Sequence, residues 1–227
     1  IPSIVTEVEK KSVVDATTNA GARSAYLIEE PIAAAIGADV DISRAEGTMV
    51  VDVGGGTCDI AVISLGGTVV HDSIKVAGDE FDQAIIRYIK KNYNMLIGER
   101  TAEIVKCRIG CVYPLFEPLT MEIKGRSLIS GLPAKVTVSS TQILDALSEP
   151  AAAIVSGVKG VLEQTPPEIL GDIVANGMLF TGGGSLVNGL DTLVSKATGI
   201  KVHIADNPAQ CVAIGTGKSL SHMEMLK

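Results

Sequence analysis

The amino-acid sequence predicts an α/β fold with an inserted segment, and three observations lead to this class. A strand meander followed by a helix is expected over 48–90, and a strand–helix–strand–helix series over 178–220. Between them, 95–140 carries short runs of a different pattern. TMVVDV at 48–53 is almost continuously apolar, as expected of a strand covered by helices on both faces. Strands and helices in this order are typical of α/β architecture.

The first 47 residues are expected to hold two helices and a short strand. Apolar residues recur at helical spacing over 5–20, and Gly21 is a typical helix stop. AYLIE at 25–29 has the length and composition of a strand. Pro31 then opens a helix of small residues, because proline is tolerated in the first turn.

A hairpin and two helices are expected next. CDIAVISL and TVVHDSIKV are predicted strands, and Gly66–Gly67 between them is a two-residue hairpin signal. Asp79 is placed to cap a helix over 80–93, because its carboxylate can accept a backbone N–H. A second helix is expected from Glu99 to about Ile109.

Strands and helices continue to the end of the chain. LTMEIKG and AKVTVSS alternate as exposed strands do. A helical stretch at about 141–163 contains Pro150, which should kink or split it. The remaining expected elements are a helix from Pro166 to Gly177, a strand MLFTG, a helix over 186–198, a strand KVHIA and a final helix over 208–220.

Composition excludes several classes of function. The chain has 227 residues and a formal net charge of -7, which argues against sequence-independent nucleic-acid binding, since that needs a basic face. No run of about 18 apolar residues could span a membrane, and no secretory signal is visible. Cys107 and Cys111 lie close together, but no histidine cluster completes a zinc site, so the cysteines are interpreted as reduced thiols of a cytoplasmic protein.

A glycine triplet interrupts the two apolar runs of VVDVGGGTCDIAVISLGG. Gly54, Gly55 and Gly56 let the backbone approach a ligand closely, with positive φ available. Consecutive N–H groups form a concavity suited to phosphate oxygens, and Thr57 adds a hydroxyl. Asp52 ends the first run, where its carboxylate could hold the water shell of a magnesium ion.

FTGGGSLVNGL, at 180–190, repeats the pattern. The triplet Gly182, Gly183 and Gly184 lies between a predicted strand and a predicted helix, so the N–H groups at the helix start would face a ligand. Because these positions carry no side chain, a flat base could lie across the turn. Either triplet alone could be a structural turn. Two triplets at strand ends favour a nucleotide site on which both turns converge. GTGKS at 215–219 resembles the end of a Walker phosphate loop, but position 212 is Val where that loop needs glycine, so it is interpreted as part of a packed helix.

These segments resemble the actin-like ATPase superfamily. VVDVGGGTCDIAVISLGG is similar to its second phosphate loop and TGGGSLVNGLDTLV to its adenosine motif. LIEEPIAAAIG and CVAIGTGKSL resemble its two connecting segments. GERTAEIVK and the stretch from TPPEI to TGGGS are similar to the MreB family in particular, and the similarity covers essentially all 227 residues. The resemblance implies an actin-like (ribonuclease H-like) ATPase fold with an inserted small α+β subdomain, and ATP and Mg²⁺ as cofactors.

The resemblance also implies roles for single residues. Glu30 would orient the attacking water, although read alone it could be only an acid favoured at a helix N-terminus. Thr57 would assist at the γ-phosphate, and Asp52 would hold the magnesium shell. Glu103 and Lys106 would contact ribose and base, whereas without the resemblance they would be a surface ion pair. The other expected nucleotide-binding residues are Gly54, Gly55, Gly56, Gly182, Gly183, Gly184 and Ser185.

The superfamily's first phosphate loop, an Asp-x-Gly-rich hairpin, does not occur in the sequence, so the resemblance implies part of a longer protein. Residues 1–47 would be the tail of a first domain, 48–80 with 147–212 a second large subdomain, 81–146 an inserted small subdomain, and 213–227 a helix returning to the first domain. Because ATP would lie between two halves, we expect this chain alone to bind it weakly and to hydrolyse it at a near-background rate.

The implied function is that of a bacterial cytoskeletal ATPase. Such a protein would polymerise head to tail, lie on the cytoplasmic face of the inner membrane and act with the cell-wall elongation machinery to set rod shape. A chaperone-type ATPase has a similar phosphate loop but needs a β domain after the last helix. A small-molecule kinase would need a catalytic aspartate in a substrate pocket, and no such pattern occurs. Sedimentation of the full-length protein with ATP would separate the three classes, because only filaments pellet.

Overall fold

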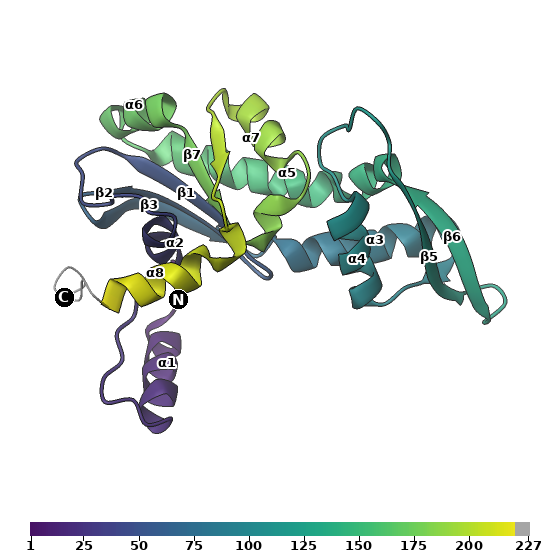
Figure 1. Cartoon of the computed structure of the whole chain (residues 1–227), viewed down its shortest axis with the longest axis horizontal. Coiled ribbons are helices and arrows are strands. Elements are labelled where there is room, and N and C mark those ends of the chain that lie inside the picture. The colour runs from purple at the N-terminus through teal and green to yellow at the C-terminus, as the bar shows by residue number, and fades with distance from the viewer. Residues whose placement is uncertain (221–227) are drawn as a thin grey trace.

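The computed structural model describes residues 1–220, which form two sheets connected by helices (Figure 1). The larger sheet has the strand order β3-β2-β1-β7-β8. β1, β2 and β3 form an antiparallel meander, and β7 and β8 run parallel to β1. The predicted α/β class is therefore confirmed. Its strands are β1 (Thr48–Val53), β2 (Cys58–Ser64), β3 (Gly67–Ile74), β7 (Met178–Thr181) and β8 (Val202–Ile204).

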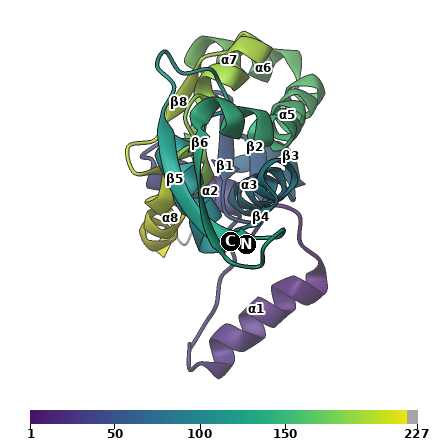
Figure 2. The ribbon, with the colours of Figure 1, turned by 90° about the vertical axis from the view of Figure 1, so that its right-hand side faces the viewer.

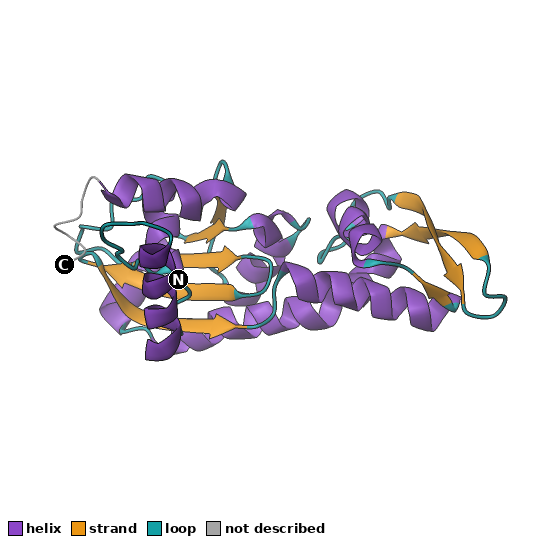
Figure 3. Cartoon of the chain, turned by 90° about the horizontal axis from the view of Figure 1, so that it is seen from below, coloured by secondary structure: helices purple, strands orange, loops and turns teal. Residues whose placement is uncertain are grey.

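The smaller sheet has the order β4-β5-β6 and lies at the other end of the molecule (Figure 3). It consists of β4 (Met95–Leu96), β5 (Thr120–Ser127) and β6 (Pro133–Ser139). Long helices run from one sheet to the other. The helices are α1 (Glu7–Asn19), α2 (Glu30–Gly37), α3 (Gly78–Tyr93), α4 (Glu99–Ile109), α5 (Ser140–Gln164), α6 (Pro167–Asn176), α7 (Leu190–Thr198) and α8 (Cys211–Ser219), with short 3₁₀ turns η1 (Gly183–Leu186) and η2 (Pro208–Gln210).

Helices cover both faces of the larger sheet, which explains the apolar sequence of β1. On one face, Val51 and Val53 pack with residues of α5, α6 and α7. On the other face, Val50 packs with α2 and α8. Side chains alternate along a strand, so Asp52 shares the face of Val50 and points to the side where α2 begins. The sheet therefore delivers one carboxylate to the end of an otherwise apolar strand.

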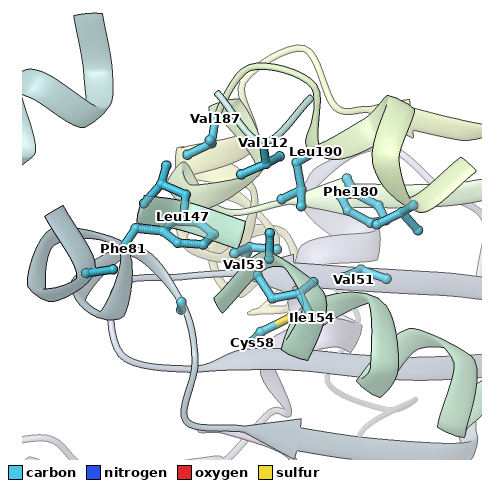
Figure 4. Packing of buried hydrophobic residues seen from close by; sticks show 14 of the residues in the cluster. Val51, Val53, Cys58, Phe81, Val112, Leu147, Ile154, Phe180, Val187 and Leu190 are labelled. Atoms are coloured by element: carbon cyan, nitrogen blue, oxygen red, sulfur yellow. The ribbon is translucent and has the colours of Figure 1, made fainter. Parts of the chain in front are cut away.

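The apolar core continues from the large sheet into the region of α3 and α4 (Figure 4). Val53 lies near Leu147 of α5 and Phe81 of α3, and all three are fully buried. Val112, just after α4, packs beside Val187, just after η1. Apolar contacts thus fix the two sheets relative to each other at the point where the glycine turns lie.

The first 30 residues differ in part from the prediction. α1 agrees with the predicted helix, but it stands apart from the rest of the chain and buries no residue (Figure 2). The predicted strand at 25–29 does not form. Ile28 accepts a hydrogen bond from the nitrogen of Ile1, and the Glu30 N–H donates to the Ile1 carbonyl. Within residues 1–220, the segment 25–29 pairs with a distant part of the backbone only at Ile1, which is too short a contact to form a β-ladder. The segment is therefore irregular.

Two turn predictions are shifted by the local backbone. The hairpin turn lies at Leu65 and Gly66, with φ values of +53° and +76°, because the preferred two-residue turn needs positive φ at both positions. Asp79 does not cap α3, which begins one residue earlier. The first N–H groups of α3 instead donate to the carbonyls of Gly54 and Gly55 in the first glycine turn, so no side-chain cap is needed.

Two helix predictions are also corrected. α5 is one continuous helix that contains Pro150, so the predicted split is wrong. Pro150 is buried, and its packing offsets the backbone hydrogen bond that proline cannot make. The helix predicted over 186–198 begins only at Leu190, because Gly189 has φ +83° and ends the preceding turn.

Both limits predicted for the small subdomain fall inside helices. The limit at 80/81 lies within α3 and the limit at 146/147 within α5, so no break in the backbone marks either point. The division stays a prediction. Of the helix predicted over 213–227, the first part belongs to α8, and 221–227 lie outside the described residues. Within residues 1–220, no helix combines the length and apolar character needed to cross a membrane.

Candidate nucleotide-binding cleft

Both glycine turns line a single cleft of about 850 Å³. It lies at the carboxyl ends of β1 and β7, the position where open α/β sheets bind ligands. α3 and α4 form the opposite wall. The cleft is lined by Asp52, Gly54, Gly55, Gly78, Asp79, Asp82, Gln83, Glu99, Arg100, Glu103, Lys106, Cys107, Gly182, Gly183, Gly184, Pro208, Ala209 and Val212.

The first turn, Gly54 to Thr57, closes on itself and leaves its central N–H groups free. The Gly54 N–H donates to the Thr57 carbonyl at 2.9 Å. The carbonyls of Gly54 and Gly55 accept from the N–H groups of Gly78 and Asp79 at 3.1 and 2.8 Å. Within residues 1–220, the N–H groups of Gly55, Gly56 and Thr57 donate to no atom. Three donors therefore remain for an anionic ligand.

The glycines of this first turn are not required by positive φ, contrary to the interpretation from the sequence. None of Gly54, Gly55 and Gly56 has a positive φ. A Cβ on Gly55 would meet only the Asp79 carboxylate, at 3.5 Å, which is an ordinary contact. At Gly55 and Gly56 the absence of side chains therefore keeps the space above the loop open, and the fold does not demand it. Gly54 differs, because a Cβ there would lie 3.3 Å from the Thr57 carbonyl oxygen, a tight contact.

The second turn combines structural and open glycines. Gly182 has φ +80°, and a Cβ there would lie 2.2 Å from the Val53 carbonyl oxygen. A Cβ on Gly184 would lie 2.6 Å from Val53 Cγ1. Gly183 differs, because its nearest neighbour would be Ala209 Cβ at 3.9 Å. Packing on β1 thus requires two glycines, and only Gly183 leaves space toward the cleft.

Ser185 and Gly56 lie outside the cleft lining, as do Thr57 and Glu30. Ser185 is fully buried and its hydroxyl donates to the Gly182 carbonyl at 2.7 Å, so it braces the second turn. Gly56 and Thr57 complete the first turn at its rim. Glu30 is half-buried at the start of α2. Burial, and then the nearby Asp59 carboxylate, raise the pKa of Glu30.

Asp52 lies at the floor of the cleft in a row of polar side chains across the sheet. It faces Asp59 on β2 and Thr181 on β7. The Thr181 hydroxyl donates to Asp52 Oδ1 at 2.6 Å. Burial raises the pKa of Asp52 to about 6, against the opposing effect of that hydrogen bond, and Glu30 and Asp59 add to the rise. Asp52 is therefore a carboxylate held close to its point of protonation.

Glu103 and Lys106 both line the cleft, but they do not pair with each other. The Lys106 ammonium donates to Asp82 Oδ2 at 2.8 Å and to the Gly78 carbonyl at 2.9 Å. The Lys106 and Asp82 side chains are only 13% and 12% exposed. The alternative interpretation of Glu103 and Lys106 as a surface ion pair is therefore wrong.

Several lining residues were not predicted from the sequence. Asp79, Asp82 and Gln83 lie at i, i+3 and i+4 of α3, and this polar stripe at the start of an amphipathic helix was a usable signal. Asp59 was also missed. It is fully buried behind the first turn, and the Ser3 N–H donates to its Oδ1 at 3.1 Å.

The charges around the cleft fit a nucleotide that arrives with a divalent cation. Asp52, Asp79, Asp82, Glu99 and Glu103 outnumber Arg100 and Lys106 in the lining, so a bare polyphosphate would meet net repulsion. No group of three or more His, Cys, Asp or Glu side chains in the described part of the chain could hold a metal by itself. Asp52 alone suits a magnesium ion that keeps its waters and phosphate ligands.

Comparison with known proteins identifies similar sequences over the whole chain. The family model described as MreB/Mbl protein matches residues 1–227. The cell shape-determining protein MreB of Escherichia coli is 49% identical over 225 residues, which are 99% of this chain and 65% of the relative. The cell shape-determining protein Mbl of Bacillus cereus is 48% identical over 225 residues, 99% of this chain and 68% of the relative. The chain thus spans about two thirds of the length of these relatives.

Solved structures show the same fold. The crystal structure of MreB5 of Spiroplasma citri bound to ADP matches with a TM-score of 0.95 and 38% identity, over 98% of this chain and 68% of that chain. The same protein bound to AMPPNP also matches with a TM-score of 0.95. Both structures hold an adenine nucleotide or its analogue in a protein of this architecture.

Proposed function

Because this chain belongs to the MreB/Mbl protein family, we propose that it forms one wall of the ATP cleft of an actin-like cytoskeletal ATPase. The nucleotides in the Spiroplasma citri MreB5 structures support the choice of ligand. Family membership favours this function over a chaperone-type ATPase. The observation that carries the proposal is that Gly55 and Gly183 line the same cleft, although they are 128 positions apart in the sequence (183 − 55 = 128).

The geometry supports separate tasks for the two ends of the cleft. The unpaired N–H groups of Gly55, Gly56 and Thr57 would bind phosphate oxygens. Gly183, with open space above it, would lie against the purine, and Glu103 and Lys106 would contact the ribose and base. Asp52 would hold the water shell of Mg²⁺, which neutralises the phosphate charge when bound.

Hydrolysis would depend on Glu30. Its raised pKa suits a carboxylate that accepts a proton from, or orients, an attacking water. Phosphoryl transfer needs groups on every side of the phosphates. We therefore assign hydrolysis to the whole protein, and we expect the 227-residue chain to show near-background turnover. Rapid phosphate release by this chain would contradict that assignment.

Nucleotide binding can be tested directly on the 227-residue chain by equilibrium dialysis against labelled ATP and ADP with Mg²⁺. We expect weak but saturable binding of both. Gly55→Ala should lower the affinity, because its methyl group would occupy space meant for phosphate while making only an ordinary contact with Asp79. Gly217→Ala is the matched control, since a Cβ there meets open space and lies outside the cleft. An unchanged affinity for Gly55→Ala would contradict the proposal.

We extend the proposal to the cellular role. Filaments of the whole protein would lie at the cytoplasmic face of the inner membrane and act with the cell-wall elongation machinery. The names of the cell shape-determining relatives support a role in cell shape. The test is a chimaera in which this chain replaces the matching segment of Escherichia coli MreB. Rod shape should return in cells that depend on the chimaera, and persistent round cells despite normal expression would count against the role.

A further inference from the structure

Lys106 reaches from α4 across the cleft wall to α3. Its ammonium group has three N–H donors, and within residues 1–220 two of them are used, one by Asp82 Oδ2 and one by the Gly78 carbonyl. Lys106 lines the cleft. One donor is thus left over for a ligand, while the other two fix the position of the nitrogen.

We propose that Asp82 is a positioning residue for nucleotide binding, which holds the Lys106 ammonium so that its remaining N–H meets an acceptor on the sugar or base. This inference rests on the proposed function. Asp82 and Gly78 are one helical turn apart on α3, so both acceptors lie on the same side of that helix. The ammonium is therefore held at two points on one rigid element.

The burial of the pair supports a role beyond surface charge. Asp82 Oδ1 is buried and accepts no hydrogen bond in the described part of the chain, so Lys106 is the only partner shown for this carboxylate. Burial raises the pKa of Asp82 despite the hydrogen bond from Lys106. By contrast, the Arg87–Glu80 pair on the same helix is 57% and 38% exposed, as is usual for surface ion pairs.

The same helix end also holds the phosphate loop. The N–H groups of Gly78 and Asp79 bind the carbonyls of Gly54 and Gly55. A Cβ on Gly78 would lie 3.2 Å from the Gly54 oxygen and 3.5 Å from Lys106 Nζ, so loop, helix and ammonium are closely packed. Lys106 is thereby fixed relative to the groups proposed to bind phosphate. Since Asp82 neutralises its charge, Lys106 acts as a directed donor.

A double-mutant cycle tests this inference. Affinities for ADP and for ATP, each with Mg²⁺, are measured by equilibrium dialysis for the wild-type chain, D82N, K106M and the double variant. We expect each single variant to bind both nucleotides about three- to tenfold more weakly, the range of one hydrogen bond. The double variant should bind no more weakly than K106M. E80Q, which breaks the exposed pair on the same helix, should bind like wild type.

Other outcomes overturn the inference. If D82N weakens binding as much in the K106M background as in the wild type, Asp82 acts independently of Lys106. If D82N strengthens ATP binding, the released charge of Lys106 matters more than its position. Should D82N unfold, D82E serves in its place, because it keeps the charge but displaces the carboxylate, and it should weaken binding only when Lys106 is present. A wild-type chain without any nucleotide binding would refute the proposed function itself.

Discussion

Asp52 is an acid that the fold keeps at an energetic cost. It is 4% exposed, and the one hydrogen bond that its carboxylate accepts within the described residues comes from the Thr181 hydroxyl. Glu30 and Asp59 lie near enough to raise its pKa further. A stable core would favour an uncharged side chain at this point. A buried carboxylate at the cleft floor thus lowers the stability of the fold, as is common at sites where a charged group binds a ligand.

Asp52→Asn should therefore stabilise the chain and abolish Mg²⁺-dependent nucleotide binding. The folded pKa of about 6 exceeds the ordinary 3.8, so the folded state binds more protons between these values. The free energy of folding that protonated Asp52 contributes is fully present below pH 3.8, and it is lost as the pH rises through about 6. In the wild type this loss is about 1 kcal/mol between pH ~5 and pH ~7.5. The variant, which can still accept from Thr181, should lack the loss and should be more stable by up to about 3 kcal/mol at pH ~7.5.

Urea unfolding at the two pH values checks this prediction. Asp145→Asn is the control, because Asp145 is exposed on α5 and lies outside the cleft lining. It should change neither the stability nor its pH dependence. Equal destabilisation of Asp52→Asn at both pH values would show that the carboxylate supports the fold.

Single residues were predictable from the sequence where a backbone signal accompanied them. Asp52 lies near the end of β1, Gly55 and Gly183 follow strand ends, and all three line the cleft. Asp79 was expected to cap a helix, because a lone acid before a helix has that local explanation. Asp79 lines the cleft because the start of α3 packs on the first glycine turn, where the Asp79 N–H donates to the Gly55 carbonyl. These two residues are 24 positions apart in the sequence (79 − 55 = 24). Contacts of this kind are tertiary and leave no local pattern.

At the scale of elements, the end of β1 determines the shape of the second glycine turn. Val53 packs against Gly182 and Gly184, so the packing of the turn on β1 requires glycine at these two positions. Gly183 is not restricted by packing, and its lack of a side chain leaves space in the cleft. The helix predicted over 186–198 failed for a related reason, because Gly189 adopts φ +83° with the Tyr113 side chain packed closely on it. The irregular segment at 25–29 has strand-like composition, yet a strand also needs a partner along its length.

Gly182→Ala should destabilise the chain by about 3 kcal/mol or more, because the new methyl group combines a left-handed φ with a backbone clash at Val53. Gly183→Ala is the matched control, one position away with its nearest contact at 3.9 Å. It should fold like the wild type and bind nucleotide less tightly. Urea midpoints measure both. Similar midpoints for the two variants would mean that Val53 does not restrict the turn.

On the scale of the whole molecule, the two sheets lie at opposite ends with the cleft between them (Figure 3). Asn188 forms a second connection between the ends: its side-chain N–H donates to the Gly110 carbonyl at 3.2 Å, and its carbonyl accepts from the Val112 N–H at 2.9 Å. Both glycine turns are thus tied to the region of α3 and α4. The order of elements predicted this architecture, and the helices predicted over 80–93 and 141–163 already crossed the expected subdomain limits. Only the uninterrupted course of α5 through Pro150 did not follow from the local pattern.

We propose that the tip of the β5–β6 hairpin contacts the next copy of the protein in a filament. Leu128, Ile129 and Leu132 are 46%, 84% and 64% exposed at the far end of the smaller sheet. Ile129→Asp in the chimaera with Escherichia coli MreB should prevent ATP-dependent sedimentation, because a charge would be buried in the contact. Val8→Asp on α1, where Val8 is 74% exposed, is the control and should sediment normally. Full sedimentation of the Ile129 variant would exclude this hairpin from the contact.

The most direct measurement is an NMR titration of the labelled 227-residue chain with Mg²⁺-ADP, followed at the backbone amides of Gly55 and Gly183. If one nucleotide bridges the two turns, both signals should shift along curves with the same dissociation constant, and Gly217 should stay unchanged. A shift confined to one turn, or two different constants, would contradict a shared site.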